Sequence, residues 1–344
     1  MKRILATILL LCLCAMAQAG LAAERTLWAY QGNAAFYVQD GKIGLLHKSG
    51  SRTLMAPILN EARPFINDLA CVRDRQLWGL LDKMGRWVFR AASVTPIDFG
   101  PDGEHGLYSP EPGLWGFINR KGQTVLEPAP YAFAGVMSQG LFAASQGQGY
   151  GYVDWNGKAV IDFQFEEALP FSEDLAAVQK DGLWGYINKS GETVLPFAYT
   201  EAGSFVKGLA PVALGQGSPT VYINPTGKTV LEGAWEWGGD FTADKLARVR
   251  VDGHYGYISQ KGRLTIPARY SNAHDFGDGC APVQANDGSW VYLNTKGKII
   301  SKQYVAAGPY QSGFAFVTYT NPDTGETVSG YINKNRFFVS QAVE

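Results

Sequence analysis

Acidic side chains recur at one position of this sequence and are the first candidates for chemistry. Glu61, Glu167 and Glu201 each precede an alanine and stand four residues before a phenylalanine, and Glu166 lies beside one of them. Aligned along a groove, such carboxylates could act in glycoside hydrolysis or bind cations. Catalysis needs one special site rather than equivalent ones. We therefore favour a structural role, in which these carboxylates accept backbone hydrogen bonds at a bend.

The histidines and the short signature motifs of the sequence do not indicate a catalytic or metal-binding site. The histidines are mutually distant and form no His-x-x-x-His pair, so a metal site is not expected. Asp-Phe-Gly at 98–100 and 275–277 imitates the kinase metal-binding tripeptide, but no Gly-rich loop or strand lysine accompanies it. The glycine-rich stretch 147–151 reads as a hairpin turn, because no helix opens after it. We expect no catalytic residue, no metal and no cofactor, and hence no enzyme.

Aromatic side chains give the remaining functional hint. The chain has 9 Trp and 17 Tyr, whose rings could stack on sugars or peptide side chains. Packing in a core explains most of them equally well. The best candidates for exposed ligand contacts depart from the regular sequence pattern: Trp155 lies in a turn, and Trp235 and Trp237 lie in the stretch GAWEWGGDF. A four-residue turn offers Trp155 little to pack against, so we predict that it is exposed.

Composition bounds the fold and the partners. The 344 residues include 30 Lys+Arg and 31 Asp+Glu, and this balance disfavours nucleic acid and acidic membranes as partners. Hydrophobic residues make up 46% and charged residues 18%, which indicates a folded chain. The 41 Gly and 13% aromatic residues are typical of tight turns and short strands, so we predict an all-β fold.

The elements that must position these side chains come from a repeat. The phrase GLWGFINRKGQTVLEP from Gly113 returns as GLWGYINKSGETVLPF from Gly182, with weaker copies elsewhere. A fixed period between 20 and 50 residues is the signature of a repeat architecture. Nine units, 34 to 39 residues apart, are marked by the residue after the central glycine: Leu45, Leu80, Phe117, Tyr152, Tyr186, Tyr222, Tyr257, Tyr292 and Tyr331.

Each unit reads as a three-stranded antiparallel meander. In the copy around Tyr186, Asp181-Gly182 forms a hairpin turn, and Asn188 to Gly191 forms a second turn capped by the Asn side chain. The connection to the next unit, of roughly ten residues, is too short for a crossover helix. We expect its phenylalanine to plug the space between neighbouring units. The three strands are 175–178, 183–187 and 192–195.

The second strand has two faces. Trp184 and Tyr186 share one face, and Gly185 between them leaves a gap into which a neighbouring backbone or ring can press. A three-stranded meander cannot bury its apolar face alone, so neighbouring units must complete each core.

An open array and a closed ring are both compatible with such units. Propellers typically close with four to eight blades of four strands, and nine units of three strands fall outside both habits. The last unit also ends after 337–340 with no strand left over to pair with the first. We therefore favour an open or superhelical solenoid, with a closed propeller-like ring as the alternative.

The units at 114–126 and 183–195 resemble the WG repeat proteins, also called KWG repeats. Both match the pattern Trp-Gly-aromatic-Ile-Asx-x-x-Gly-x-x-Val, and the resemblance covers essentially the whole mature chain. The units at Leu45, Tyr222 and Tyr292 lack the Trp-Gly pair, and Arg336 replaces the turn glycine of the last unit. The resemblance implies an all-β repeat array, often exported by bacteria, with no shared catalytic residues and no common ligand.

The N-terminal residues indicate export. Lys2 and Arg3 precede an apolar run that ends in Ala17-Gln18-Ala19, which is typical of a secretory signal peptide at 1–19. Cleavage at Ala23/Glu24 and an uncleaved membrane anchor are the competing readings. We expect one repeat domain over 20–344, with no membrane span after cleavage, in the periplasm or outside a bacterial cell.

Two cysteines, Cys71 and Cys280, remain in the mature chain, each in an apolar strand-like stretch. Their distance in a repeat array favours buried small hydrophobes over a disulfide.

The sequence predicts an exported, non-enzymatic binding or scaffold protein whose partner is a protein or glycan of the cell envelope. A secreted carbohydrate-binding or carbohydrate-active protein, using aromatic platforms and groove carboxylates, is the alternative. A structural spacer is a third hypothesis, and it predicts no concave aromatic surface.

Overall fold

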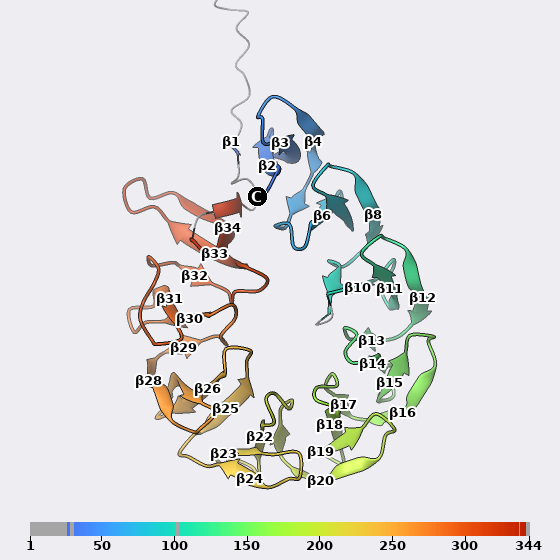
Figure 1. Ribbon diagram of the computed structural model, residues 1–344, viewed down its shortest axis with the longest axis vertical. Coiled ribbons are helices and arrows are strands. Elements are labelled where there is room, and N and C mark those ends of the chain that lie inside the picture. Colours follow the sequence, from blue (N-terminus) through green and yellow to red (C-terminus); the bar gives the residue numbers. More distant parts are fainter. Residues whose placement is uncertain (1–25, 28–30, 101–102, 337, 342–344) are drawn as a thin grey trace, which may run out of the picture.

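Nine small antiparallel sheets follow one another around a central opening (Figure 1). This computed structural model describes residues 26–27, 31–100, 103–336 and 338–341, and the predicted signal peptide at 1–19 lies outside this range. Each sheet is built from strands that are consecutive in the sequence, and every strand pair is antiparallel. The described residues contain strands, turns and bends but no helix, which confirms the all-β prediction.

The strands are assigned to sheets in chain order. Sheets one to three contain β1 (Thr26–Leu27), β2 (Ala34–Gln39), β3 (Lys42–His47), β4 (Thr53–Leu59), β5 (Glu61–Ala62), β6 (Leu69–Asp74), β7 (Leu77–Asp82), β8 (Trp87–Ser93), β9 (Asp98–Phe99), β10 (His105–Tyr108), β11 (Leu114–Asn119) and β12 (Thr124–Pro130). Sheets four to six contain β13 (Phe133–Ala134), β14 (Leu141–Ser145), β15 (Tyr150–Asp154), β16 (Ala159–Phe165), β17 (Glu167–Ala168), β18 (Leu175–Lys180), β19 (Leu183–Asn188), β20 (Thr193–Tyr199), β21 (Glu201–Ala202), β22 (Ala210–Ala213), β23 (Thr220–Ile223) and β24 (Thr229–Leu231). Sheets seven to nine contain β25 (Trp237–Phe241), β26 (Leu246–Val251), β27 (His254–Ser259), β28 (Leu264–Tyr270), β29 (Asn272–Ala273), β30 (Cys280–Gln284), β31 (Trp290–Asn294), β32 (Ala306–Ala307), β33 (Phe314–Thr320), β34 (Thr327–Asn333) and β35 (Phe338–Gln341).

Most units have one more strand than the sequence predicts. The acidic residue and alanine of the connection form a short first strand, and in the fifth sheet Glu167 pairs with Gln179 and Ala168 with Val178. Eight sheets therefore have four strands, while the eighth has three. The three-stranded prediction is wrong because a two-residue strand is too short for alternation to reveal it.

The sheets form a nine-bladed β-propeller ring, so the preference for an open solenoid is wrong. The short strands β13 and β17 lie toward the central opening, and the longer strands β12, β16 and β20 lie at the outer edge (Figure 1). Each sheet is thus narrow at the central opening and wide at the outer edge. When such wedge-shaped sheets pack face to face, each is rotated about the central axis relative to the one before it. A three-stranded unit does not have this wedge shape, so the sequence did not indicate a ring.

The ring closes without exchanging a strand between its ends. The last strand, β35, pairs with β34 inside its own sheet. The loop that carries Gln311 and Ser312 of the ninth sheet shares a cavity with Arg63 of the second sheet. Among the described residues, no strand is left over from the ninth sheet, but this does not require an open array.

The core lies between neighbouring sheets, as predicted. Tyr186 is fully buried, its ring centroid lies 4.8 Å from that of Phe205 in the next sheet, and its hydroxyl donates to the Gly203 carbonyl at 2.8 Å. The predicted plug role of the connection's phenylalanine is therefore confirmed. Other pairs repeat the contact: Tyr152 with Phe171 at 4.7 Å, Tyr222 with Phe241 at 5.1 Å, and Tyr257 with Phe276 at 4.8 Å.

Turns and glycines also follow the sequence reading. The Asn188 Oδ1 atom accepts hydrogen bonds from the backbone N–H groups of Ser190 and Glu192, both at 3.0 Å. A Cβ atom on Gly185 would lie 2.9 Å from the Leu195 carbonyl oxygen, so the predicted close approach is confirmed. In the last unit Arg336 takes the turn-glycine position with φ of 64°.

The two cysteines of the described chain form no disulfide. Cys71 and Cys280 are free, with Cys280 buried and Cys71 half-buried. Across the described part of the chain, no helix has the length and apolar character needed to cross a bilayer.

Candidate functional site

Trp235 belongs to the core, and the prediction that it is exposed is wrong. Only 5% of its surface is accessible, and its ring lies 5.7 Å from that of Tyr222. Trp235 follows Tyr222 at the same spacing at which Tyr199 follows Tyr186, and Tyr199 packs on Tyr186 in the same way. This spacing was the available signal that Trp235 is a core residue.

Trp155 is half-buried, so the prediction that it has little to pack against is also wrong. Its ring lies 4.1 Å from His105 and 6.0 Å from Phe117, both in the third sheet. The turn that carries Trp155 leans on the preceding sheet, a contact that a single unit read alone does not reveal.

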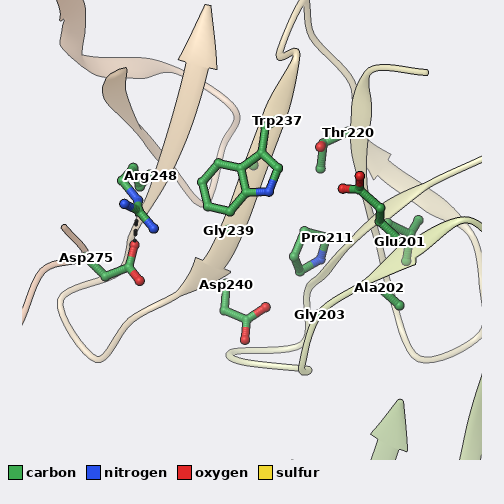
Figure 2. A pocket seen from close by; sticks show the side chains of 12 residues that line it. Glu201, Ala202, Gly203, Pro211, Thr220, Trp237, Gly239, Asp240, Arg248 and Asp275 are labelled. Carbon is green, nitrogen blue, oxygen red and sulfur yellow. Dashed lines mark ion pairs between the residues drawn. The ribbon is translucent and has the colours of Figure 1, made fainter. Parts of the chain in front are cut away.

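Trp237, the remaining candidate, lines a pocket of about 260 Å³ between the sixth, seventh and eighth sheets (Figure 2). The sixth sheet contributes Glu201 and Pro211, the seventh Trp237 and Asp240, and the eighth Asp275. Strand β21 carries Glu201, and strand β25 carries Trp237 and Asp240. Both are the first strands of their sheets. The pocket is therefore an intersheet site rather than a property of one repeat.

Asp240 is the most perturbed carboxyl group of the pocket. Burial raises its pKa to about 6, while the backbone N–H of Ser204, which donates to Oδ1 at 3.0 Å, opposes the rise. The nearby charge of Asp275 acts in the same direction as burial. An added positive charge would relieve both unfavourable effects.

Arg248 contacts both Asp275 and Trp237 in the pocket. Its Nε atom lies 3.1 Å from Oδ1 of Asp275, and its guanidinium lies 4.9 Å from the centroid of the Trp237 ring. The guanidinium also donates to the backbone carbonyl of Ala273. One face of the indole is thus occupied by Arg248, and Figure 2 shows Pro211 and Glu201 on the other side of the ring.

The pocket is negatively charged. Glu201, Asp240 and Asp275 outnumber the single cation Arg248, and no other ionisable residue lines it. Within the described residues, no three or more His, Cys, Asp or Glu side chains are placed to hold a metal ion. An aromatic ring beside carboxylates is suited to an organic cation.

The nine units supply an internal control, because equivalent positions follow from strand pairing. The position of Trp237 holds an acidic residue, Asn, Ala or another aromatic residue in other sheets: Glu61, Phe133, Glu167, Glu201, Asn272 and Ala306. The position of Arg248 holds small or apolar residues elsewhere: Cys71, Ala143, Ala177, Pro211, Pro282 and Phe316. The residue before the plug is Asp240 in the seventh sheet and Asp275 in the eighth, whereas other sheets have Pro64, Val136, Pro170, Ser204 or Pro309. Side chains that depart from the repeat therefore converge on one pocket.

The recurrent acids have different surroundings. Glu61 forms an ion pair with Arg73 at 3.3 Å, and Glu201 lines the pocket. The predicted backbone hydrogen bond belongs to the preceding residue, since Glu166 accepts from the Gly182 N–H at 3.0 Å. The expected position was thus one residue off. Sequence reasoning missed Asp240 and Asp275 because it compared motifs with known enzymes and not each unit with its neighbours.

Comparison with known proteins identifies the repeat. The sequence profile of the WG containing repeat matches residues 115–149, 150–184, 184–216, 222–254, 255–290 and 290–321, more than half of the chain. The chain belongs to the WG repeat family. The matched WG repeats include the unit that carries Trp237, Asp240 and Arg248. No protein among those with curated descriptions matches the chain in sequence.

Solved structures resemble this WG repeat protein at low sequence identity. A eukaryotic initiation factor has a TM-score of 0.57 and 14% identity, covering 91% of this chain and 97% of that one. BamB from Moraxella catarrhalis has a TM-score of 0.47 and 15% identity, with 79% and 95% covered. AztD from Citrobacter koseri has a TM-score of 0.46 and 11% identity, with 80% and 93% covered. Likeness at this level concerns the fold alone.

Proposed function

We propose that this WG repeat ring is an exported, non-enzymatic binding or scaffold protein of the cell envelope, and that its inner pocket holds a positively charged side chain of a partner protein. One observation carries the proposal: Trp237, Asp240, Arg248 and Asp275 all depart from the repeat and all line the same pocket. A scaffold does not need these departures, and burial of Asp240 without a cation is unfavourable.

The charge of the pocket favours an ammonium or guanidinium group. Glu201 and Asp240 approach from the sixth and seventh sheets, and Figure 2 shows the indole of Trp237 between Glu201 and Arg248, with Asp240 below the ring. A cation in this space gains charge-assisted hydrogen bonds from carboxylates and attraction from the ring. Lys and Arg side chains combine such a cation with an apolar stem that suits Pro211 and Ala202.

The pocket volume restricts the size of the bound group. Ligand clefts commonly enclose about 300–1,000 Å³, and this pocket has about 260 Å³. It therefore suits one side chain better than a whole ligand, and the rest of the partner would contact the surrounding ring. Export of the complex to the envelope rests on the predicted signal peptide at 1–19.

A blocked tetralysine peptide is a direct probe, measured by titration calorimetry with the mature chain. We expect binding that is lost with a tetraglutamate peptide and weakened about tenfold by Glu201→Gln or Asp240→Asn, since each removes one charge-assisted contact. Glu166→Gln is the matched control, because that side chain caps a hairpin turn outside the pocket. Equal binding by the pocket variants and the control would rule out this site.

A carbohydrate-active function is the second candidate, because an aromatic ring and carboxylates meet in this pocket. A glycosidase must place two carboxyl groups on opposite sides of a glycosidic bond and hold sugars on both sides. Asp275 is already ion-paired with Arg248, and the volume of about 260 Å³ leaves little room for two sugar units. Release of reducing sugar from envelope glycans by the wild type, lost in Asp240→Asn, would favour this alternative over the binding role.

A further inference from the structure

A second, larger cavity lies between the second and third sheets. Its volume is about 660 Å³, and the ninth sheet reaches it through Gln311 and Ser312. The cavity shares no lining residue with the pocket around Trp237. It therefore constitutes a separate candidate site, where the ninth sheet approaches the second and third sheets.

Arg63 presents unused hydrogen-bond donors in this cavity. Its guanidinium carbon lies 4.9 Å from the centroid of the Trp78 ring, and its Nε atom is buried without a hydrogen-bond partner. The Nε atom of Arg73 is also buried without a hydrogen-bond partner, but this guanidinium, 5.7 Å from the same tryptophan ring, forms an ion pair with Glu61 at 3.3 Å. For Arg63 the described residues provide no ion pair within 4.0 Å. A buried, unsatisfied guanidinium donor is costly unless another group completes its contacts.

The repeat does not require an arginine here. Arg63 follows the short strand β5, and the residue at this position in other units offers its backbone carbonyl to a tyrosine of the preceding sheet. The third sheet has Asp98 at this position, and the fourth to ninth sheets have uncharged or weakly basic residues: Gly135, Leu169, Gly203, Gly239, His274 and Gly308. Arg63 is thus a departure from the repeat, as Trp237 and Asp240 are in the first pocket.

Among the described lining residues of the cavity, the positive charges outnumber the negative charges by one. Arg63 and Arg120 are cations, and Asp98 is the one carboxyl group among the lining residues. Arg120 donates to the backbone carbonyls of Asn67 and Gly103, which fixes its position. Burial raises the pKa of Asp98, and the charge of Arg63 opposes that rise.

The remaining walls are apolar. Leu69 and Leu80 of the second sheet face Ile97 and Phe99 of the third. An apolar body would displace water from these side chains, while its charged end satisfied the guanidinium. A monoanion matches the single excess charge better than a phosphate dianion does.

We propose that this cavity binds an organic monoanion, a carboxylate joined to an apolar chain, with the carboxylate on the Arg63 guanidinium and the chain against Ile97 and Phe99. The site is independent of the cation pocket, so either can fail without the other.

Octanoate is the probe, and 1-octanol and octylamine are its uncharged and cationic counterparts, each titrated calorimetrically into the mature chain. We expect octanoate to bind, and both counterparts to bind at least tenfold more weakly. Arg63→Gln should weaken octanoate binding at least tenfold. Arg73→Gln should change it less than twofold, because Arg73 does not line the cavity. Equal affinity for octanoate and octanol, no octanoate binding, or equal effects of the two substitutions would overturn the proposal.

Cys71 gives a second readout that needs no variant. This thiol lines the cavity, and burial raises its pKa to about 11, so labelling by N-ethylmaleimide is followed at alkaline pH. Saturating octanoate should slow the labelling of Cys71 several-fold and leave that of Cys280, in the eighth sheet, unchanged. Unaltered labelling of Cys71, or equal slowing at both thiols, contradicts occupation of this cavity, even if Arg63→Gln fails to fold.

Discussion

The hydroxyl of Tyr222 donates a hydrogen bond of 2.8 Å to the carbonyl of Gly239. Tyr222 marks the sixth repeat, and Gly239 lies in the seventh, between the pocket residues Trp237 and Asp240. The residue that defines the scaffold therefore fixes the backbone that carries the candidate site. Equivalent bonds link Tyr152 to Leu169 at 2.6 Å and Tyr257 to His274 at 2.6 Å.

Tyr222→Phe tests this link. Loss of the hydroxyl leaves a carbonyl without its partner and should lower the free energy of unfolding by about 1–2 kcal/mol. Tyr152→Phe should cost a similar amount, because its bond is equivalent. Only Tyr222→Phe should also weaken tetralysine binding, since Leu169 does not line the pocket. Urea unfolding and calorimetry separate the two effects, and equal loss of binding in both variants would contradict the link.

Truncation of Trp235 should mainly lower stability, whereas truncation of Trp237 should mainly weaken tetralysine binding. Trp235→Ala removes a buried ring and is expected to cost about 3–5 kcal/mol of unfolding free energy. Trp237 is half-buried at the edge of the pocket, so Trp237→Ala should destabilise much less but abolish tetralysine binding. Thermal unfolding gives the first comparison and calorimetry the second. A larger loss of stability at Trp237 than at Trp235 is the result that the structure forbids.

Asp240 predicts a pH dependence of stability. Burial raises the pKa of its carboxyl group from 3.8 to about 6, so the folded chain holds this proton more tightly than the unfolded chain. Protonation thus favours folding, and the stability contributed at low pH is lost as pH rises from 3.8 through about 6. Asp240→Asn should remove that loss and raise stability at pH 7 by up to roughly 3 kcal/mol.

Urea unfolding at several values of pH measures this difference. Asp154 is the control of opposite sign, because turn N–H groups lower its pKa and its stabilising effect is lost as pH falls. Tetralysine should also bind more tightly as pH rises through 6, since a cation favours the ionised form of Asp240. An unchanged pH profile in Asp240→Asn would show that this carboxyl titrates normally.

Alanine substitutions at Gly122 and Gly182 distinguish the cost of backbone strain from the cost of a packing clash. Both have φ of 74°, so an alanine at either position should cost about 1–2 kcal/mol. A Cβ atom at Gly182 meets nothing within 4 Å, whereas at Gly122 it would overlap the Val88 carbonyl of the second sheet. Gly122→Ala should therefore be clearly more destabilising in thermal unfolding. Equal melting temperatures would mean that the second and third sheets are not packed as described.

Much of the fold could be predicted because the same sequence pattern occurs in nine units. The turn at Asn188, the face shared by Trp184 and Tyr186, and the plug Phe205 all follow from local rules of turns and alternation. Ring closure could not be predicted in the same way. It depends on the two-residue inner strands and on a small rotation between sheets, which no single unit displays.

The candidate site was predicted only in part. Trp237 was singled out because its stretch departs from the repeat, and it does line a pocket. Asp240, Arg248 and Asp275 were missed, because each contributes from a different strand or sheet and only stacking brings them together. Aligning all units by strand pairing marks these residues from sequence once the inner strand is known.

The most direct test of the cation site replaces the pocket residues that differ from the repeat pattern by residues typical of other units. The variant Trp237→Ala, Asp240→Ser, Arg248→Ala and Asp275→Ser places at each position a residue that another unit uses or closely resembles. Titration of tetralysine into this variant and into the wild type is the deciding measurement. The account predicts a folded ring, at least as stable at pH 7, that no longer binds the peptide. Undiminished binding by the restored ring would contradict it.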